Sequence, residues 1–466
     1  MGTRMHKDTI FREYDVRGIV GKDYDTAFAG DLAASFAAFV TRQLKTPGHG
    51  RTRFKIAVGR DVRPSGTEMA PLFCKALLDR GFDVVDLGVV PTPLVYFSTF
   101  YYEVDGAVCI TGSHNPPEYN GFKICLGQST LHGSQVQELK HILAAGETLK
   151  PTASRGQTET KPVVADYHRH VLSIIKIPRK VKVVIDSGNA VGGLVAPKLL
   201  RELGCEVIEL FCDIDGSFPN HHPDPTVEEN LVDLKAAVAE HRADLGIAFD
   251  GDADRIGAVD EKGHTIFGDE LMILYAREIL TRKPGAKIIG EVKCSNRMFQ
   301  DIEKRGGKPI MWKTGHSLIK SKMKEENAEL AGEMSGHIFF KDRYFGYDDA
   351  IYAAARLLEI AAGTNEPFST LLADLPPTVN TPELRVDCPD DVKFKVVERV
   401  KTELARRFKV IDIDGVRIET DRGWGLLRAS NTQPVVVMRF EAQTVGELNE
   451  LRYVVESAFK AALKSS

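Results

Sequence analysis

Strand-like and helix-like patterns alternate through most of this chain. Residues 54–61, 82–90 and 106–110 are short apolar runs, and residues 28–45 and 65–81 have the periodicity of amphipathic helices. Such alternation predicts α/β layers, in which helices cover a sheet. Open α/β sheets bind ligands at the carboxyl ends of their strands, so the polar loops that follow the strands are where chemistry is expected.

A similar strand opening recurs along the chain. VKVVIDSGNAVGG at 181–193 and AKIIGEVKCSN at 286–296 each pass from an apolar run into a polar loop. After LPPTVNTPE at 375–383 the pattern becomes antiparallel α+β. We therefore predict three related α/β domains with mixed sheets and a C-terminal α+β domain, a number that suits a chain of 466 residues. The expected boundaries are 1–160, 161–263, 264–377 and 378–466.

Composition and charge narrow the class of partner. The chain is 43% hydrophobic and 27% charged, with a formal net charge of −4, so it has no overall attraction for nucleic acid or an anionic membrane. Its seven cysteines are scattered and never form a CxxC pair, which is typical of a reducing compartment. There is no apolar leader and no apolar run of the ~18 residues that a membrane span needs. We expect a cytoplasmic protein that binds small molecules.

The loop TGSHNPP, residues 111–117, follows the apolar run GAVCI at 106–110. The segment Asn115-Pro116-Pro117 prevents a helix from starting at once, so the loop should project and expose Ser113. Ser113 is therefore a candidate nucleophile. Serine, asparagine and proline are also ordinary turn residues, and this loop alone favours a plain turn.

The segment DGDADR, residues 250–255, follows the apolar run LGIAF. Asp250, Asp252 and Asp254 concentrate negative charge that a hard divalent cation would offset, and three side chains leave coordination positions open for a phosphate, as in Mg²⁺ sites. An EF-hand is the alternative, since Glu261 stands at its twelfth position. However, Arg255 occupies the place of the required glycine and the flanks look like strands. A calcium-binding module is thus the weaker interpretation.

Two further polar loops complete the set. GEMSGH, residues 332–337, can present Glu333 and Ser335 to sugar hydroxyls, although a glycine-flanked turn is equally possible. RASNTQP, residues 428–434, offers an arginine fork and neutral donors to a phosphate. No Walker A motif competes for phosphate binding.

In this order the four motifs resemble the α-D-phosphohexomutase family, from FREYDVRG at 11–18 to RASNTQP at 428–434. The resemblance implies four domains around a central cleft. We expect a monomer. It implies reversible phosphoryl transfer between the 1 and 6 positions of mannose and glucose phosphates. Glucose 1,6-bisphosphate or mannose 1,6-bisphosphate would be both the intermediate and the activator.

The resemblance also implies roles for residues at matching positions. Ser113 would carry the phosphoryl group, and Asp250, Asp252 and Asp254 would hold one Mg²⁺ against it. Lys123, with a pKa lowered by neighbouring cations, would be the general acid and base. The remaining implied residues are His114 and Arg255 in catalysis, Lys293, His316, Glu333, Ser335 and His337 at the sugar and its phosphoryl groups, and Tyr14, Arg17, Arg428, Ser430, Asn431 and Thr432 around the phosphate that does not react.

Two alternatives stay open at this point. A phosphoglucosamine mutase would usually carry TASHNP, GEQSGH and RTSGTEP forms of the motifs, which this chain lacks. A non-catalytic sugar-phosphate-binding protein on the same scaffold would need neither the serine nor the three aspartates. One departure from the family pattern is Gln433, where threonine is common; it puts little in doubt because the matched donors precede it.

Overall fold

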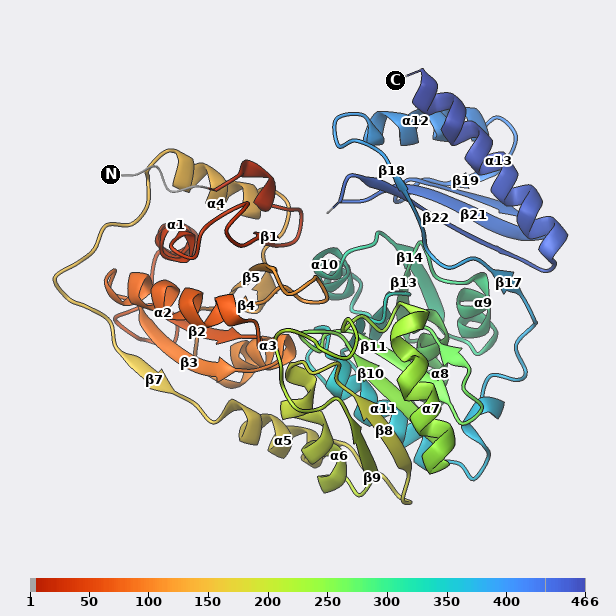
Figure 1. The fold of residues 1–466 in the computed structure, drawn as a ribbon, viewed down its shortest axis with the longest axis horizontal. Coiled ribbons are helices and arrows are strands. Elements are labelled where there is room, and N and C mark those ends of the chain that lie inside the picture. Colours follow the sequence, from red (N-terminus) through yellow and green to blue (C-terminus); the bar gives the residue numbers. More distant parts are fainter. Residues whose placement is uncertain (1–5, 432, 466) are drawn as a thin grey trace.

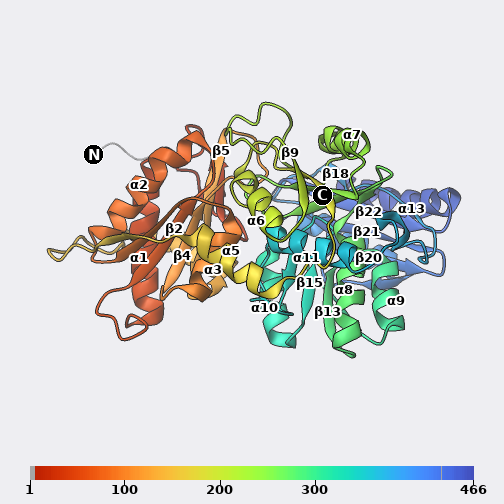
Figure 2. The same cartoon turned by 90° about the horizontal axis from the view of Figure 1, so that it is seen from below.

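The computed structural model describes residues 6–431 and 433–465. Within them the chain forms four sheets in succession, with seven, five, four and six strands (Figures 1 and 2). Thr432, predicted for the phosphate loop, lies outside the described residues. None of the described helices is long and apolar enough to cross a membrane.

The first sheet has the strand order β1-β5-β4-β2-β3-β7, with β6 beside β5. Strands β4, β2, β3 and β7 are parallel, whereas β5 runs antiparallel to both β4 and β1. The strands are β1 (Val16–Ile19), β2 (Lys55–Arg60), β3 (Asp83–Val89), β4 (Gly106–Ile110), β5 (Tyr119–Leu126), β6 (Ser129–Thr130) and β7 (Thr158–Thr160). The helices of this unit are α1 (Phe28–Leu44), α2 (Pro64–Leu78), α3 (Thr92–Tyr101) and α4 (Ser134–Ala144).

The second sheet has the order β12-β11-β10-β8-β9 and ends at Ile266, beyond the expected boundary at residue 263. Its strands are β8 (Lys182–Asp186), β9 (Glu206–Leu210), β10 (Leu245–Phe249), β11 (Ile256–Asp260) and β12 (Thr265–Ile266). The accompanying helices are α5 (Val163–Ile174), α6 (Ala196–Glu202) and α7 (Val232–His241).

The third sheet has the order β14-β13-β15-β16. Its strands are β13 (Lys287–Glu291), β14 (Lys308–Trp312), β15 (Leu330–Gly332) and β16 (Ile338–Phe340). The accompanying helices are α8 (Gly268–Arg282), α9 (Asn296–Lys304), α10 (His316–Glu326) and α11 (Ala350–Ala362).

A common hairpin relates these three units. In each, a buried strand with a parallel neighbour is followed by an antiparallel strand: β4 by β5, β10 by β11, and β15 by β16. Strands β4 and β10 are buried along their whole length, which explains their continuous apolar sequences. The loops of these hairpins are the TGSHNPP, DGDADR and GEMSGH motifs. The prediction of three related α/β units with mixed sheets is confirmed.

The fourth sheet is antiparallel, and helices α12 and α13 pack on it, as predicted for an α+β unit. The RASNTQP loop joins β21 to β22. The elements are β17 (Val379–Asn380), β18 (Leu384–Asp387), α12 (Lys393–Leu404), β19 (Lys409–Ile411), β20 (Val416–Thr420), β21 (Gly423–Ala429), β22 (Val435–Ala442) and α13 (Val445–Lys464). This unit lies beside the third one, opposite the first (Figure 1).

Candidate active site

The serine loop is shaped by a buried arginine. Ser113 has a left-handed backbone conformation, with φ of 50°, and is only 2% exposed. The Arg63 guanidinium donates hydrogen bonds to the carbonyl oxygens of Ser113 (2.8 Å), Asn115 (2.5 Å), Pro116 (2.5 Å) and Tyr119 (2.9 Å). The expectation that Ser113 is exposed is therefore wrong, because Arg63 folds the loop back and the second unit covers it.

A carboxylate completes this support. Asp61, directly after β2, accepts hydrogen bonds from Arg63 Nε (3.0 Å), Thr111 Oγ1 (2.8 Å) and the Gly112 amide (3.1 Å). Both Asp61 and Arg63 are buried, so each ion compensates the other. A Cβ at Gly112 would lie 2.5 Å from the Arg63 guanidinium, which explains the glycine.

The aspartate loop lies directly against the serine loop. Ser113 Oγ donates to Asp250 Oδ2 at 3.1 Å and lies 3.2 Å from His114 Nδ1. A Cβ at Gly251 would be 2.3 Å from the Ser113 carbonyl oxygen, so only glycine allows this approach. Burial, and then the Arg255 guanidinium, lowers the pKa of His114 well below its usual value, which keeps that ring neutral.

The three aspartates form a compact set of oxygen ligands. Asp250, Asp252 and Asp254 are fully buried and each offers a carboxylate oxygen within 4.8 Å of the others. Asp252 Oδ1 and Asp254 Oδ1 have no hydrogen-bond partner among the described residues. Burial, and then the other two carboxylates, raises the pKa of Asp250 well above its usual value. Three crowded carboxylates with hard oxygen donors fit a divalent cation.

Lys123 on β5 joins the first unit to this loop. Its Nζ lies 2.7 Å from Asp252 Oδ2 and also donates to Asp254 Oδ2. Burial favours the neutral amine, but the Asp252 and Asp254 carboxylates outweigh it and raise the pKa of Lys123 above its ordinary value. The prediction of a lowered pKa is wrong, because its nearest charged neighbours are carboxylates. Lys123 is a fixed positive charge.

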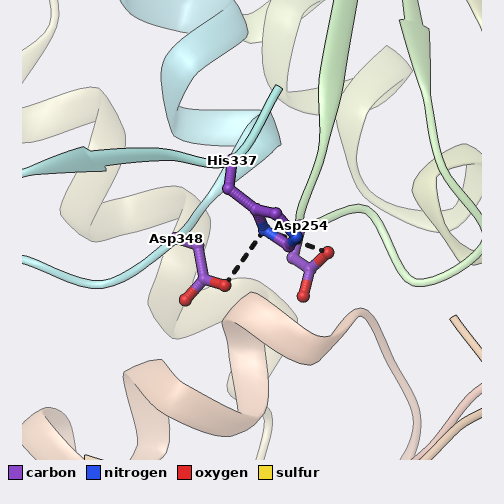
Figure 3. Close-up of side chains that lie close together, drawn as sticks. All are labelled: Asp254, His337 and Asp348. Atoms are coloured by element: carbon purple, nitrogen blue, oxygen red, sulfur yellow. Dashed lines mark ion pairs between the residues drawn. The ribbon is translucent and has the colours of Figure 1, made fainter. Parts of the chain in front are cut away.

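His337 has a defined tautomer. Arg255 Nε donates to His337 Nε2 at 2.9 Å, and since a guanidinium can only donate, Nε2 carries no hydrogen. The ring hydrogen is assigned to Nδ1, which faces Asp348 Oδ2 at 3.2 Å and Asp254 Oδ1 at 3.5 Å (Figure 3). Asp254, His337 and Asp348 lie within metal-binding distance of one another, but a protonated Nδ1 does not suit a metal.

Glu291, at the end of β13, holds three loops of the third unit together. It accepts hydrogen bonds from Thr314 Oγ1 (2.7 Å), the Lys293 amide (3.0 Å) and the Met334 amide (3.3 Å). Glu333 accepts from the Gly315 amide at 2.6 Å. Ser335, half-buried, lies on the same β15–β16 loop.

The fourth unit meets the N-terminal loop at Tyr14. Asn431 Nδ2 donates to Tyr14 Oη at 2.8 Å, and Tyr14 Oη donates to the Thr314 carbonyl at 2.9 Å. Arg428 Nε donates to Asp414 Oδ2 at 2.9 Å, and the same oxygen accepts from the Thr314 amide at 3.0 Å. The RASN loop is therefore joined to both the first and the third units.

Family comparison agrees with this organisation. Models described as phosphoglucomutase/phosphomannomutase alpha/beta/alpha domains I, II and III match residues 8–150, 165–263 and 267–379. The model of the C-terminal domain matches residues 383–457. The chain belongs to the phosphoglucomutase/phosphomannomutase family.

Individual relatives in this family are similar over nearly their full length. A phosphomannomutase/phosphoglucomutase of Pseudomonas putida is 45% identical over 96% of this chain and 94% of that protein. A phosphoglucomutase of Neisseria meningitidis serogroup A is 45% identical over 98% of this chain and 97% of that protein. The crystal structure of a family protein from Burkholderia thailandensis superposes with a TM-score of 0.91 at 42% identity, covering 98% of each chain.

Within this family framework, the predicted residues fall into two groups. Around Ser113 lie His114, Lys123, Arg255, His337 and the three aspartates. Near Tyr14 lie Asn431 and, through Thr314 and Asp414, Arg428. His316 links the groups, since its ring centroid is 5.7 Å from Tyr14 and 5.6 Å from His337. Arg17 reaches the serine loop, since its Nη1 donates to Asn115 Oδ1 at 2.7 Å.

Sequence reasoning missed Asp61, Arg63, Glu291 and Asp348. Asp61 and Glu291 stand at the carboxyl ends of buried strands, and this position was an available signal. Asp348 precedes the apolar helix α11 and looks like an ordinary capping residue. Arg63 gives no local signal, because its partners are about fifty residues away in the chain.

We predict that Arg63→Met loosens the serine loop. Asp61 would lose its buried partner, and breaking such a pair typically costs about 3–5 kcal/mol of folding free energy. The midpoint of urea unfolding should fall, and the amides of residues 111–119 should exchange hydrogen faster. Arg53→Met, at a partly exposed position, is the matched control. Unchanged stability and exchange in Arg63→Met would contradict the assigned support.

Proposed function

We propose that this chain catalyses reversible phosphoryl transfer between the 1 and 6 positions of mannose and glucose phosphates. Ser113 carries the phosphoryl group, and a hexose 1,6-bisphosphate is the intermediate and activator. The observation that carries the proposal is the contact of Ser113 Oγ with Asp250 beside Lys123 and Arg255. A serine, a carboxylate cluster and cations in a buried site suit phosphoryl transfer, which depends on alignment and charge stabilisation.

In the first half-reaction a sugar hydroxyl attacks phosphorus on phosphoserine 113. An oxygen–phosphorus bond to the sugar forms, and the bond to Ser113 Oγ breaks. We propose that His337 Nε2 is the base that accepts the proton of the sugar hydroxyl. Its lone pair becomes available when Arg255 leaves it and binds the phosphoryl group. The leaving Ser113 oxygen takes up a proton from water, and His337 returns its extra proton to water. The Ser113 hydroxyl that results donates a hydrogen bond to Asp250 Oδ2. The bisphosphate then turns, and its other phosphoryl group returns to Ser113 by the reverse steps.

One Mg²⁺ is proposed at Asp250, Asp252 and Asp254. Their clustered oxygens, two of them without a hydrogen-bond partner among the described residues, support it. When bound, the ion would neutralise charge on the phosphoryl group that is transferred. Lys123 orients Asp252 and Asp254 by binding one oxygen of each.

The remaining groups are assigned to the sugar and to the phosphate that does not react. Arg428, Ser430, Asn431 and Tyr14 would clamp that phosphate, because an arginine fork with neutral donors suits its oxygens. Lys293 would contact a phosphoryl group, and His316, Glu333 and Ser335 would contact the sugar hydroxyls. A clamp that recognises a phosphate on either carbon explains how one site serves both directions.

The choice of sugar rests on the motifs. The TGSHNPP, GEMSGH and RASN forms favour mannose and glucose over glucosamine. A non-catalytic binding protein is disfavoured by the intact Ser113–Asp250 contact. We further propose the four domains 1–160, 161–263, 264–377 and 378–466, with all groups of the site in one chain, so that a monomer suffices. Seven free cysteines support a cytoplasmic location.

The activity test is a coupled assay with mannose, glucose and glucosamine 1-phosphates, Mg²⁺ and a trace of glucose 1,6-bisphosphate. Mannose and glucose 1-phosphates should be converted, and Ser113→Ala should lower kcat by about a thousandfold or more because it removes the phosphoryl acceptor. Ser173→Ala, on the exposed face of α5, is the control. Full turnover by Ser113→Ala would rule out the phosphoserine route.

Metal dependence provides a second test. EDTA should abolish turnover, and Mg²⁺ should restore it better than Ca²⁺, since a phosphoryl site with few protein ligands suits the smaller ion. Asp252→Asn should lose most of this Mg²⁺ response, whereas Asp233→Asn on exposed α7 should keep it. Equal activity of Asp252→Asn with and without EDTA would refute the assignment.

Asp348→Asn tests how His337 is oriented. Asp348→Asn removes the nearer of the two carboxylates that face Nδ1, so the Nδ1–H tautomer is less favoured. The kcat should fall about a hundredfold while KM changes little. Asp374→Asn, a half-exposed carboxylate that pairs with arginines, is the control. A kcat close to that of the unchanged protein would remove Asp348 from this role.

A further inference from the structure

Glu383 places a carboxylate among the cations of the phosphate site. It lies just before β18, and its Oε2 is 2.9 Å from Nζ of the buried Lys293. Its Oε1 accepts a hydrogen bond from Arg385 Nε (3.0 Å) and forms an ion pair with Arg385 Nη2 (2.9 Å). One carboxylate thus engages a cation of the third unit and one of the fourth.

The charge of Glu383 is strongly favoured. Burial works against ionisation, but the cations Lys293, Arg385 and Arg428 outweigh it and lower the pKa of Glu383 to about 2. Glu383 is therefore an anion throughout the neutral range. An anion surrounded by a lysine and arginines occupies the kind of environment that a phosphate prefers.

Arg385 connects this anion to the RASNTQP loop. Arg385 Nη1 donates to the side-chain oxygen Oε1 of Gln433 at 2.8 Å. The backbone amide of Gln433 donates to Ser430 Oγ at 3.2 Å. Gln433 is the residue that departs from the family pattern, and here it holds a guanidinium at the edge of the phosphate loop. The Arg385 side chain is 53% exposed, so it is free to change partner.

We infer that Glu383 is an internal counter-ion that competes with the substrate's phosphate, and that Arg385 is a further phosphate-binding residue. The inference rests on the proposed function and deepens it. A sugar phosphate that enters beside Arg428 meets Lys293 and Arg385 already paired with Glu383. Arg385 exchanges the carboxylate for the phosphate, because its planar fork fits the oxygens of either.

This competition serves the turning of the bisphosphate. The intermediate must release the clamp before its other end can enter. As the phosphate leaves, the Glu383 carboxylate pairs again with Lys293 and Arg385. This renewed pairing lowers the barrier to release of the phosphate. The phosphate affinity is thereby held below what the cations alone would give.

The test measures equilibrium binding of inorganic phosphate and of glucose 1-phosphate by calorimetry with the full chain. Glu383→Gln keeps the size of the side chain and removes its charge, so both ligands should bind about five-fold tighter, the effect of one nearby charge at a protein surface. Arg385→Met should weaken both by about five-fold. Both shifts should shrink as salt is added, because salt screens exposed charges.

The opposite signs distinguish competition from a merely structural role, which would weaken binding in both variants. Glu419→Gln is the matched control: Glu419 pairs with Arg417 at the same boundary between the third and fourth units and should leave phosphate binding unchanged. Tighter binding in Glu383→Gln with weaker binding in Arg385→Met supports the inference.

Either of two results overturns it: phosphate binding in Glu383→Gln that is unchanged or weaker, or unchanged binding in Arg385→Met. Because Arg385 is half-exposed, Arg385→Met should fold normally. Its phosphate binding therefore tests the role of Arg385 even if Glu383→Gln is unstable. The outcome is separate from that of the proposed function. If the unaltered chain converts hexose phosphates and these variants fail to diverge, only the inference is wrong.

Discussion

The ion pairs of Lys123 with Asp252 and Asp254 are the interaction on which the site depends. They connect β5 of the first unit to the loop after β10 of the second, and all three side chains are buried. Separating them would leave uncompensated charges inside the protein, which typically costs several kcal/mol. The same contact that arranges the three aspartates therefore fixes the position of the serine loop against them.

The three related units supply three different chemical functions from one structural position. The loop between a parallel strand and the antiparallel strand that follows it carries Ser113 in the first unit, the aspartates in the second and His337 in the third. Since these loops lie at the carboxyl ends of their parallel strands, their side chains converge once the units pack together. The fourth unit contributes a loop of another kind, between two antiparallel strands.

The strands and the motif loops that follow them could be predicted from the sequence. The contacts between residues far apart in the chain could not. The apolar runs GAVCI and LGIAF and the polar loops after them lie close together in the chain, so the strands and motif residues were recognisable. The pKa of Lys123 was predicted with the wrong sign because Asp252 lies 129 residues away. Arg63 and Glu291 support loops through distant backbone groups, and Arg17 bonds the distant Asn115. No pattern near these residues reveals such partners.

The cations assigned to phosphate already have partners in the protein. Arg428 is paired with Asp414, Lys293 with Glu383, and Arg255 donates to His337. Buried cations without partners would destabilise the fold, so these pairs keep the site ordered without a ligand. A phosphate then enters by exchange of partners, and only the difference between two sets of charge-assisted hydrogen bonds contributes to its binding. Under the proposed function, this exchange would let the site hold a doubly phosphorylated sugar and release each end in turn.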